Sequence, residues 1–359
     1  MTTKKIVVLG GYGSFGSLIA DQLVNSGAEL IVSGRDSNRG QAFADSIRAR
    51  FVRCDVSNRE SLRRTVEGAF LVINATGPYL PAEYSIPKTC VTEKCNYIDL
   101  ADGREYVKNF NLLDSLAKEN SVFACTGAST TPAITTALMD ELHKETDGVS
   151  EIKIAMSPGT RNPAGVATFE SILSYVGKPI TIWRNGKHQD AMGWGEPEMA
   201  SFADPIGRRR VQLCNIPDLD IFPQRYHADT VTFKAGVEIT ILNIALGFLG
   251  EVRRRLPRLD LPKLTKLLIF GSHFFQPLGT TAGGMQIWVK DLDGKQRSIA
   301  VVALANGPRI PTAPAVIIGR KLIHEGVYAH GAFPCVGLIN LKETREYLSE
   351  FGIEIRRSD

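Results

Sequence analysis

Short apolar runs alternate with amphipathic segments along the first 130 residues. The run "KIVVL" at 5–9 is typical of a strand buried on both faces, and the apolar positions from 15 to 23 then recur at helical spacing. Five further strands, each preceded by a helical pattern, are predicted at 28–34, 51–56, 69–77, 96–101 and 121–127. This alternation predicts an α/β fold with a doubly wound parallel sheet and helices on both of its faces.

The pattern changes from about residue 150, where hairpins and short alternating strands replace the strand–helix rhythm. Asn185-Gly186 and Asp293-Gly294 separate pairs of such strands and predict hairpin turns. Two helices are predicted at 167–177 and 240–256. Other strands are expected at 151–159, 208–216 and 230–239. The middle of the chain should therefore be an α+β domain built on a mainly antiparallel sheet.

Helical patterns return at 312–326 and 340–352, and Asn340 with Glu343 has the spacing of a capping box. We expect this last part of the chain to pack against the first domain, which makes the middle an insertion. The predicted organisation has three segments. They are a nucleotide-binding domain at 1–130, a substrate and dimerisation domain at 131–309, and C-terminal helices at 310–359 that return to the first domain.

The first predicted turn has the glycine spacing of a dinucleotide-binding fold of the Rossmann type. Gly11 would permit the tight turn after the strand, Gly13 would let backbone N–H groups approach a pyrophosphate, and Gly16 would permit close helix–strand packing. Ser14 and Phe15 lie between the last two glycines, at the N-terminus of the helix. That N-terminus would face the phosphates with its partial positive charge.

The end of the second predicted strand favours NADP over NAD. NAD sites usually have a carboxylate here, whereas this chain has Ser33, Gly34 and then Arg35. A guanidinium can pair with a 2′-phosphate, and Arg39 could add a second cation. Asp36 is the alternative, because its carboxylate could serve a ribose 2′-hydroxyl. The sequence leaves open which of Arg35 and Asp36 contacts the adenosine ribose.

The carboxyl ends of the other predicted strands should border the same crevice. Tyr79 would point towards the reacting carbon, and Asp99 and Asp102 are the other candidates for handling a proton. Tyr97 is a further candidate, although it could equally be a core residue, and Asp99 could instead cap a turn. Further cofactor contacts are predicted at Asp55, Val56, Ala75, Thr76, Gly77 and Pro78. For Asp55 a helix cap or an Asx-turn is the alternative.

Four motifs together make the chain similar to the saccharopine dehydrogenase family. They are the glycine fingerprint, "GPY" at 77–79, "YIDLADG" at 97–103 and "TGASTTP" at 126–132. The segment "GRKLIHEGVYAHGAFPCVGLINL" at 319–341 resembles the closing segment of that family. The resemblance implies an N-terminal NADP-binding domain with an inserted substrate domain. It also implies that Gly11, Gly13, Gly16, Arg35 and Thr76 contact the cofactor.

Family members of this kind form or break a C–N bond by hydride transfer to or from an imine. The resemblance therefore implies an NAD(P)-dependent oxidoreductase that acts on an imine, a secondary amine or a related carbonyl compound. Saccharopine-type substrates carry several carboxylates and need arginines in the pocket, and no motif in the middle of this chain matches those. Two alternatives stay open: a non-catalytic NADP(H) sensor, and a reductase of a lipid-like substrate at a membrane surface. The second is motivated by the apolar and basic segment at 237–275.

Composition narrows the remaining possibilities. A net charge of +4 with dispersed basic residues does not indicate nucleic-acid binding. The six histidines are spread singly, so no metal site is predicted, and the six cysteines lack a C-x-x-C pair, which favours reduced thiols. The longest apolar run, at 239–250, is shorter than the about 20 residues that a membrane-spanning helix needs. We expect a cytoplasmic homodimer that takes a small-molecule substrate.

Overall fold

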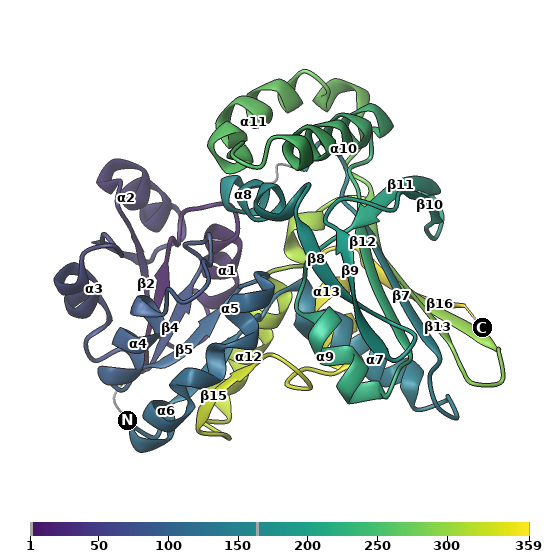
Figure 1. Cartoon of the computed structure of the whole chain (residues 1–359). Helices are drawn as coiled ribbons and strands as arrows, with labels where there is room; N and C mark the ends of the chain where they lie inside the picture. The colour runs from purple at the N-terminus through teal and green to yellow at the C-terminus, as the bar shows by residue number, and fades with distance from the viewer. Residues whose placement is uncertain (1–2, 163–164, 359) are drawn as a thin grey trace. The chain divides into compact units, whose positions relative to one another are not determined.

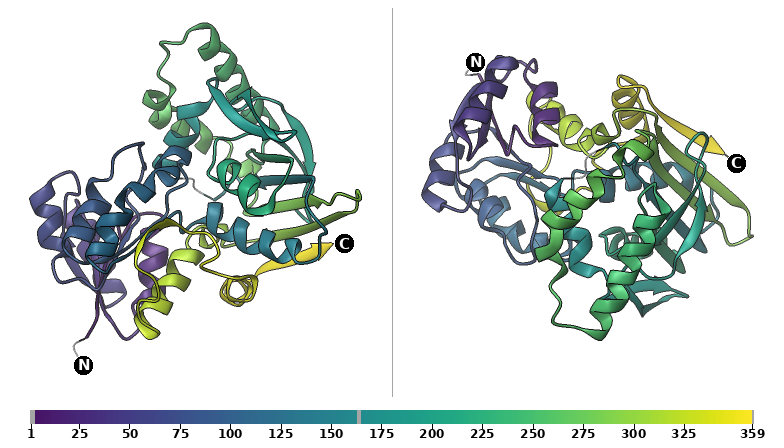
Figure 2. Two further views of the ribbon diagram at one scale, coloured as in Figure 1. Left: turned by 60° about the horizontal axis from the view of Figure 1, so that its bottom comes forward. Right: turned by 90° about the horizontal axis from the view of Figure 1, so that it is seen from above.

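The computed structural model describes residues 3–162 and 165–358, which fall into two compact units (Figure 1). The first unit combines Met1–Ile134 with Pro308–Thr344, and the second combines Thr135–Gly307 with Arg345–Asp359. Each unit is therefore built from two separate stretches of the chain. In the views of Figure 1 and Figure 2, residues 308–344, coloured yellow-green, lie among the purple and blue elements of the first unit.

The first unit holds a seven-stranded parallel sheet in the order β15-β6-β5-β4-β1-β2-β3. The prediction of a doubly wound parallel sheet is confirmed. Its strands are β1 (Lys5–Leu9), β2 (Glu29–Gly34), β3 (Arg50–Arg53), β4 (Leu71–Asn74), β5 (Asn96–Asp99), β6 (Phe123–Thr126) and β15 (Gly331–Pro334). The helices are α1 (Gly16–Leu23), α2 (Ser37–Ser46), α3 (Arg59–Val66), α4 (Ser85–Thr92), α5 (Arg104–Lys108), α6 (Asp114–Glu119) and α12 (Ala313–His324), with short helices η1 (Phe110–Leu113), η2 (Thr130–Ile134) and η5 (Gly307–Arg309).

Continuous apolar runs form this sheet because its central strands are covered on both faces. All four residues of β4, of β5 and of β6 are buried. On one side lies an aromatic cluster in which the rings of Tyr97 and Phe110 stack, with centroids 6.2 Å apart. On α1, Ile19 and Leu23 are buried, as their helical spacing predicted. All six cysteines are buried, free thiols.

The second unit holds a mixed sheet in the order β10-β11-β12-β7-β13-β14-β16, with the β8–β9 hairpin joined to β12. Only the β12–β7 pair is parallel among the described strand pairs of this sheet, which agrees with the prediction of a mainly antiparallel sheet. The strands are β7 (Glu151–Ser157), β8 (Pro179–Arg184), β9 (Lys187–Met192), β10 (Glu198–Ser201), β11 (Arg208–Leu213), β12 (Thr230–Ala235), β13 (Gly283–Lys290), β14 (Gln296–Ala303) and β16 (Ile353–Ser358).

The helices of this unit lie against the sheet and against each other. Helices α7 and α9 pack against strands of the sheet, while α11 packs against α8. Asn185 and Gly186 both have positive φ in the turn between β8 and β9, as the hairpin signal predicted. The helices are α7 (Thr135–His143), α8 (Val166–Tyr175), α9 (Asp218–Tyr226), α10 (Thr240–Arg255) and α11 (Thr265–His273), with short helices η3 (Leu261–Leu264) and η4 (Gln276–Leu278). Helix α13 (Leu341–Ser349) contains the boundary at Thr344 between the two units.

The end of the chain differs in part from the expectation for 310–359. Helix α12 packs against α1, and the predicted capping box is present: the Asn340 N–H donates to Glu343 and the Glu343 N–H donates to Asn340 Oδ1. The last six described residues, however, form β16, which pairs with β14 in the second unit and is not a helix. Its "IEIRRS" alternation suits an edge strand with one face covered, and Ile353 is buried.

Candidate functional site

The glycine turn after β1 allows two backbone segments to approach closely. Gly10, at φ +71°, takes the left-handed conformation that makes the turn. The glycine motif had assigned this tight turn to Gly11. A Cβ atom on Gly16 would lie 2.2 Å from the Gly10 carbonyl oxygen, which leaves no room for any side chain. The Gly11 N–H donates to the Ser33 carbonyl oxygen at 3.0 Å and ties the turn to β2.

The N-terminus of α1 has the form of a phosphate cradle. Phe15 is its N-cap residue and provides no side-chain hydrogen bond to the first turn. The first N–H groups of a helix have no partner within the helix and can bind an anion, although in α1 the Ser17 N–H already donates to the Gly13 carbonyl oxygen at 3.0 Å. The Gly13 N–H is used within the turn, where it donates to the Gly10 carbonyl oxygen at 2.9 Å. These residues therefore fit a pyrophosphate at Ser14, Phe15 and Gly16.

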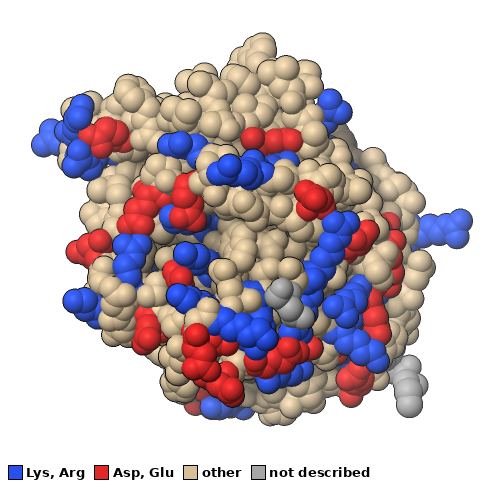
Figure 3. All heavy atoms as spheres, turned by 90° about the vertical axis from the view of Figure 1, so that its right-hand side faces the viewer, with Lys and Arg blue, Asp and Glu red and all other residues tan. Residues whose placement is uncertain are grey.

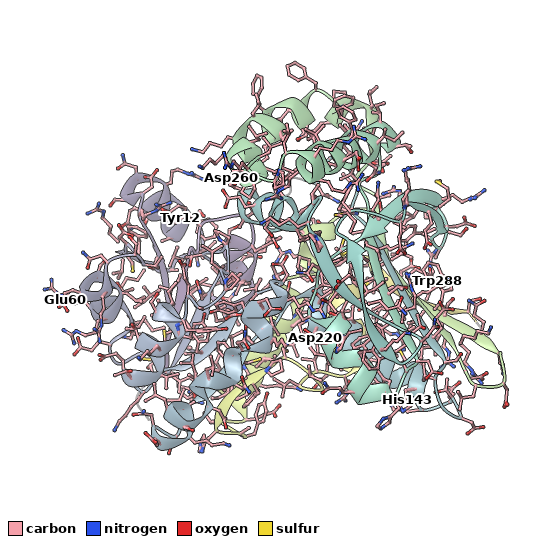
Figure 4. All side chains as sticks on the ribbon, viewed as in Figure 1. Tyr12, Glu60, His143, Asp220, Asp260 and Trp288 are labelled. Atoms are coloured by element: carbon pink, nitrogen blue, oxygen red, sulfur yellow. The ribbon has the colours of Figure 1, made fainter. Side chains whose placement is uncertain are left out.

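Tyr12, which the sequence analysis did not single out, joins the glycine turn to the end of β2 (Figure 4). Its hydroxyl accepts a hydrogen bond from the Asp36 N–H at 2.7 Å. Its ring fills the space above Gly34, where a Cβ atom would lie 2.4 Å from Tyr12 Cε1. The Arg39 guanidinium stands 5.6 Å from the centre of the same ring. Gly34 is thus required by the packing of an aromatic side chain.

Three arginines gather at the carboxyl ends of β2 and β3. Arg35 and Arg39 are exposed, and the Arg53 Nε–H donates to the Arg35 carbonyl oxygen at 3.3 Å. Asp36 is the N-cap of α2, and its Oδ1 accepts the Arg39 N–H at 3.1 Å. Its carboxylate thus has a structural role, while the guanidinium of Arg35 is exposed beside it. This cationic end of β2 suits a 2′-phosphate.

Asp55 and Val56 follow β3. Asp55 forms an Asx-turn, because its Oδ1 accepts the Ser57 N–H at 3.1 Å and the Ser57 hydroxyl at 2.7 Å. The Ser57 hydroxyl, with smaller contributions from Arg35 and Arg53, lowers the pKa of Asp55. Val56 is half-buried against the core of the first unit. The turn alternative for Asp55 is therefore present, and the carboxylate remains ionised at neutral pH.

Asn74 organises the segment after β4 and was not among the predicted site residues. Its Oδ1 accepts the Thr76 N–H at 3.0 Å and the Thr76 hydroxyl at 2.5 Å, and its Nδ2–H donates to the Tyr97 hydroxyl at 3.0 Å. Thr76 also faces the glycine turn, since its Cγ2 lies 3.0 Å from where a Gly10 Cβ would be. Ala75 and Gly77 are half-buried and Pro78 is exposed. The predicted cofactor residues of β1 and β4 thus meet at one sheet edge.

The three proton-handling candidates differ in how they are held. The Tyr79 hydroxyl donates to the Asn74 carbonyl oxygen at 2.7 Å and accepts the Leu100 N–H at 3.3 Å, and burial raises its pKa well above the usual value. Asp102 lies half-buried between β5 and α5. The buried Oδ1 of Asp99 accepts hydrogen bonds at 2.7–3.0 Å from Ala101 N–H, Gly127 N–H and the Thr126 hydroxyl.

Burial raises the pKa of Asp99 to about 6, and the donors around it hold the pKa down. Asp99 therefore joins β5 to the turn after β6 as a structural carboxylate, in the turn-capping role that the sequence left open. Tyr97 is likewise fully buried in the aromatic core. Tyr79 and Asp99 both lie at the predicted edge of the sheet, where the Tyr79 hydroxyl and Asp99 Oδ1 are hydrogen-bonded within the protein, whereas Asp99 Oδ2 is buried without a partner among the described residues.

Two arginines of the "RRR" run in β11 have different roles. Arg209 is buried and donates to the Ser157 hydroxyl, to the Pro158 and Ala282 carbonyl oxygens and to Glu238 Oε1, at 3.0–3.3 Å. Arg209 thereby joins β11 to three other backbone segments of the second unit. Arg210 instead lines a cavity of about 550 Å³, together with Trp194 and Gln212. This volume is that of a small-molecule site.

The cavity beside Arg210 contains polar atoms without protein partners among the described residues. They are Arg210 Nε, Trp194 Nε1 and Gln212 Oε1. Trp194 and Gln212 are both almost fully buried, and Trp194 has a positive φ of 62°. Two N–H donors and one carbonyl oxygen are therefore available to a small polar molecule inside the second unit. No sequence motif indicated this site, because its residues come from β9, β11, α10 and adjoining loops.

Comparison with known proteins agrees with this geometry. Residues 6–146 match the family model of the saccharopine dehydrogenase NADP-binding domain. The structure of a saccharopine dehydrogenase (L-Glu forming) from Saccharomyces cerevisiae superposes with a TM-score of 0.69 at 12% identity, over 99% of this chain and 100% of that chain.

An L-fucose dehydrogenase from Oryctolagus cuniculus is 31% identical over 88 residues, which cover 22% of this chain and 31% of that protein. The chain thus spans about a third of the length of this curated relative. The family-model match supports NADP binding by residues 6–146. Residues 6–146 are thus similar to the saccharopine dehydrogenase NADP-binding domain, in a chain that has the fold of a saccharopine dehydrogenase.

Proposed function

We propose that the chain is an NADP-dependent oxidoreductase that transfers hydride between NADP(H) and an imine, a secondary amine or a related carbonyl compound. The observation that carries the cofactor half of this proposal is the cationic end of β2, where Arg35, Arg39 and Arg53 gather beside the Tyr12 ring. The first turn of α1 would hold the pyrophosphate, and Arg35 the 2′-phosphate. When bound, NADPH supplies the hydride.

The choice of substrate class is supported by how the proton candidates are held. Tyr79 is a poor proton donor because its pKa is raised, and its hydroxyl is already engaged by the backbone on both sides. Asp99 Oδ1 accepts three hydrogen bonds. A substrate that arrives already protonated, such as an iminium ion, needs no side chain to donate a proton. The residues would then orient the substrate and exclude water.

The cofactor half is tested by titrating the protein with NADPH and with NADH and following nicotinamide fluorescence. Arg35→Ala should weaken NADPH binding about 10- to 100-fold, because hydrogen bonds to charged groups contribute about 1.5–3 kcal/mol, and should leave NADH binding unchanged. Arg50→Ala is the matched control. Arg50 lies at the opposite end of β3 from Arg53, exposed and paired with Glu29. Equal loss of NADH affinity in Arg35→Ala would contradict a 2′-phosphate contact.

The substrate half is tested by following NADPH consumption with mixtures of amino acids and 2-oxo acids, which form imines, and with aldehydes and ketones alone. Turnover only with the mixtures supports an imine reductase. Turnover with the carbonyl compounds alone would place the substrate in the carbonyl class. Tight binding of NADPH and NADP⁺ without turnover of any compound would favour the sensor alternative over catalysis.

A further inference from the structure

Helices α10 and α11 carry large apolar side chains on their solvent side. Ile241, Ile244 and Phe248 are spaced to share one side of α10, and Leu267 and Phe270 of α11 have the same spacing to Phe274, the C-cap residue that follows α11. These six residues, here called the apolar face, are each 47–71% exposed. Figure 3 shows an uncharged area in the middle of the top of the picture, at the height where Figure 1 places the two helices, with charged side chains at its borders.

The extent of this exposure is large for a monomer. The three phenylalanines alone expose roughly 400 Å², taking about 200 Å² for each side chain, which is already the size of the largest patch on a typical soluble monomer. The rings of Phe270 and Phe274 lie edge to face, with centroids 5.6 Å apart. Leu256 and Leu278, near the ends of the same segment, are also more than half exposed. Single exposed apolar residues are ordinary, but a continuous set on two helices marks a binding surface.

The opposite sides of the same helices are apolar as well. Leu242, Leu246 and Leu249 of α10, with Leu268 and Ile269 of α11, line a cavity of about 160 Å³. An amphipathic helix of a globular protein turns one side to the core and a polar side to water. Here the core side is apolar and half-buried around this cavity, and the other side is apolar too. A helix that is apolar on both sides is normally covered on both sides, so the apolar face requires an occupant.

The charge around the apolar face decides between possible occupants. The segment 240–278 contains six Lys and Arg residues against two Asp and Glu residues. Arg254, Arg255, Arg258, Lys263 and Lys266 are all exposed at the end of α10, in the connection, or in the first turn of α11. A second copy of the chain, docked by two-fold symmetry, would bring these like charges together. A surface of anionic lipid would instead neutralise them.

We propose that the second unit binds the surface of an anionic lipid bilayer through the apolar face of α10 and α11. Phe248, Phe270 and Phe274 would enter the boundary between headgroups and acyl chains, and the surrounding arginines and lysines would contact lipid phosphates. The helices would lie on the membrane. In the part of the chain that the structure describes, no helix is long and apolar enough to cross it. This binding requires neither NADP(H) nor turnover.

The test is flotation of the purified full chain with vesicles of phosphatidylcholine alone and of phosphatidylcholine mixed with phosphatidylserine. We expect the wild type to float with the mixed vesicles, much less with phosphatidylcholine alone, and less at high salt. Combined Phe248→Ser, Phe270→Ser and Phe274→Ser should lower the vesicle-bound fraction roughly tenfold or more. The matched control is Leu112→Ser with Leu292→Ser, since both leucines are 65–73% exposed elsewhere on the chain.

NADPH titration of the triple variant shows whether its first unit is folded, and far-UV circular dichroism with a thermal melt shows whether the second unit is. Size-exclusion chromatography with light scattering then separates the remaining outcomes. If the wild type floats with neither kind of vesicle, the proposal is overturned. If that wild type is a dimer and the triple variant a monomer, the occupant is a second copy. Equal flotation of the triple variant and the wild type also overturns the proposal, because binding would then lie elsewhere.

Discussion

Asp218, the first residue of α9, offers a quantitative test of the structure. Its carboxylate is fully buried, and neither oxygen has a hydrogen-bond partner among the described residues. The hydroxyls of Thr135 and Thr136, at the start of α7, are also buried without partners. Burial raises the pKa of Asp218 from 3.8 to about 7. The perturbation we choose is Asp218→Asn, which keeps the shape and removes the charge.

The sign and size of the effect follow from the pKa. The folded chain holds the proton more tightly than the unfolded chain, so Asp218 costs nothing below about pH 4, and its cost grows as the pH rises towards 7. Above pH 7 the full cost is about 4 kcal/mol, at about 1.36 kcal/mol for each tenfold change in proton affinity. Asp218→Asn removes this cost. The variant should therefore gain stability over the wild type as the pH rises.

The assay is a thermal melt of the wild type and the variant between about pH 5 and about pH 8. The difference in Tm should grow across this range to roughly 10 °C, at about 2–4 °C per kcal/mol for a unit of this size. Asp190→Asn, an exposed position on β9, is the control and should show no such trend. A variant that loses stability relative to the wild type as the pH rises would refute the reasoning, because the carboxylate would then be ionised and well paired in the folded chain.

Three further predictions concern other buried positions. Gly16→Ala forces a Cβ against the Gly10 carbonyl oxygen and should cost about 1–3 kcal/mol in a thermal melt while weakening NADPH binding in the fluorescence titration. Asp99→Ala should destabilise the first unit by about 1–3 kcal/mol in urea unfolding at pH 5, since three buried donors then lose their acceptor; unchanged stability would show that these donors have other partners. Arg209→Ala should cost about 3–5 kcal/mol in urea unfolding because it strips a buried ion pair, whereas Arg208→Ala, exposed on the same strand, should cost under 1 kcal/mol.

The parallel sheet could be predicted from the sequence because its strands are continuous apolar runs with helical patterns between them. Strand β15 could not, because its four residues, Gly331–Pro334, begin and end with residues that are poor strand formers. Strand β16 is short and its last residues are charged, so the helical pattern before it dominated the prediction. In both cases pairing with a strand distant in sequence, not local propensity, makes the strand.

The candidate site was predictable where one backbone segment makes it. The glycine turn and Arg35 lie within one strand–helix–strand unit, and their spacing is the signal. The roles of Asn74 and Asp99 depend on partners from other segments: Asp99 accepts an N–H from a turn 28 residues further along the chain. The residues next to Asn74 and Asp99 in the sequence do not indicate such a partner. Tyr12 had a signal that was missed, an aromatic residue inside the glycine turn facing the small Gly34.

The division of the chain between its two units has a consequence for synthesis on the ribosome. The first unit needs Pro308–Thr344 for β15 and α12, and the second needs Arg345–Asp359 for β16. The first unit is therefore incomplete until β15 has left the exit tunnel, and the second until β16 has. Until then β6 and β14 each expose an edge that awaits its neighbour, and such open edges invite pairing between nascent chains. We expect the emerging chain to depend on chaperones up to its last strand.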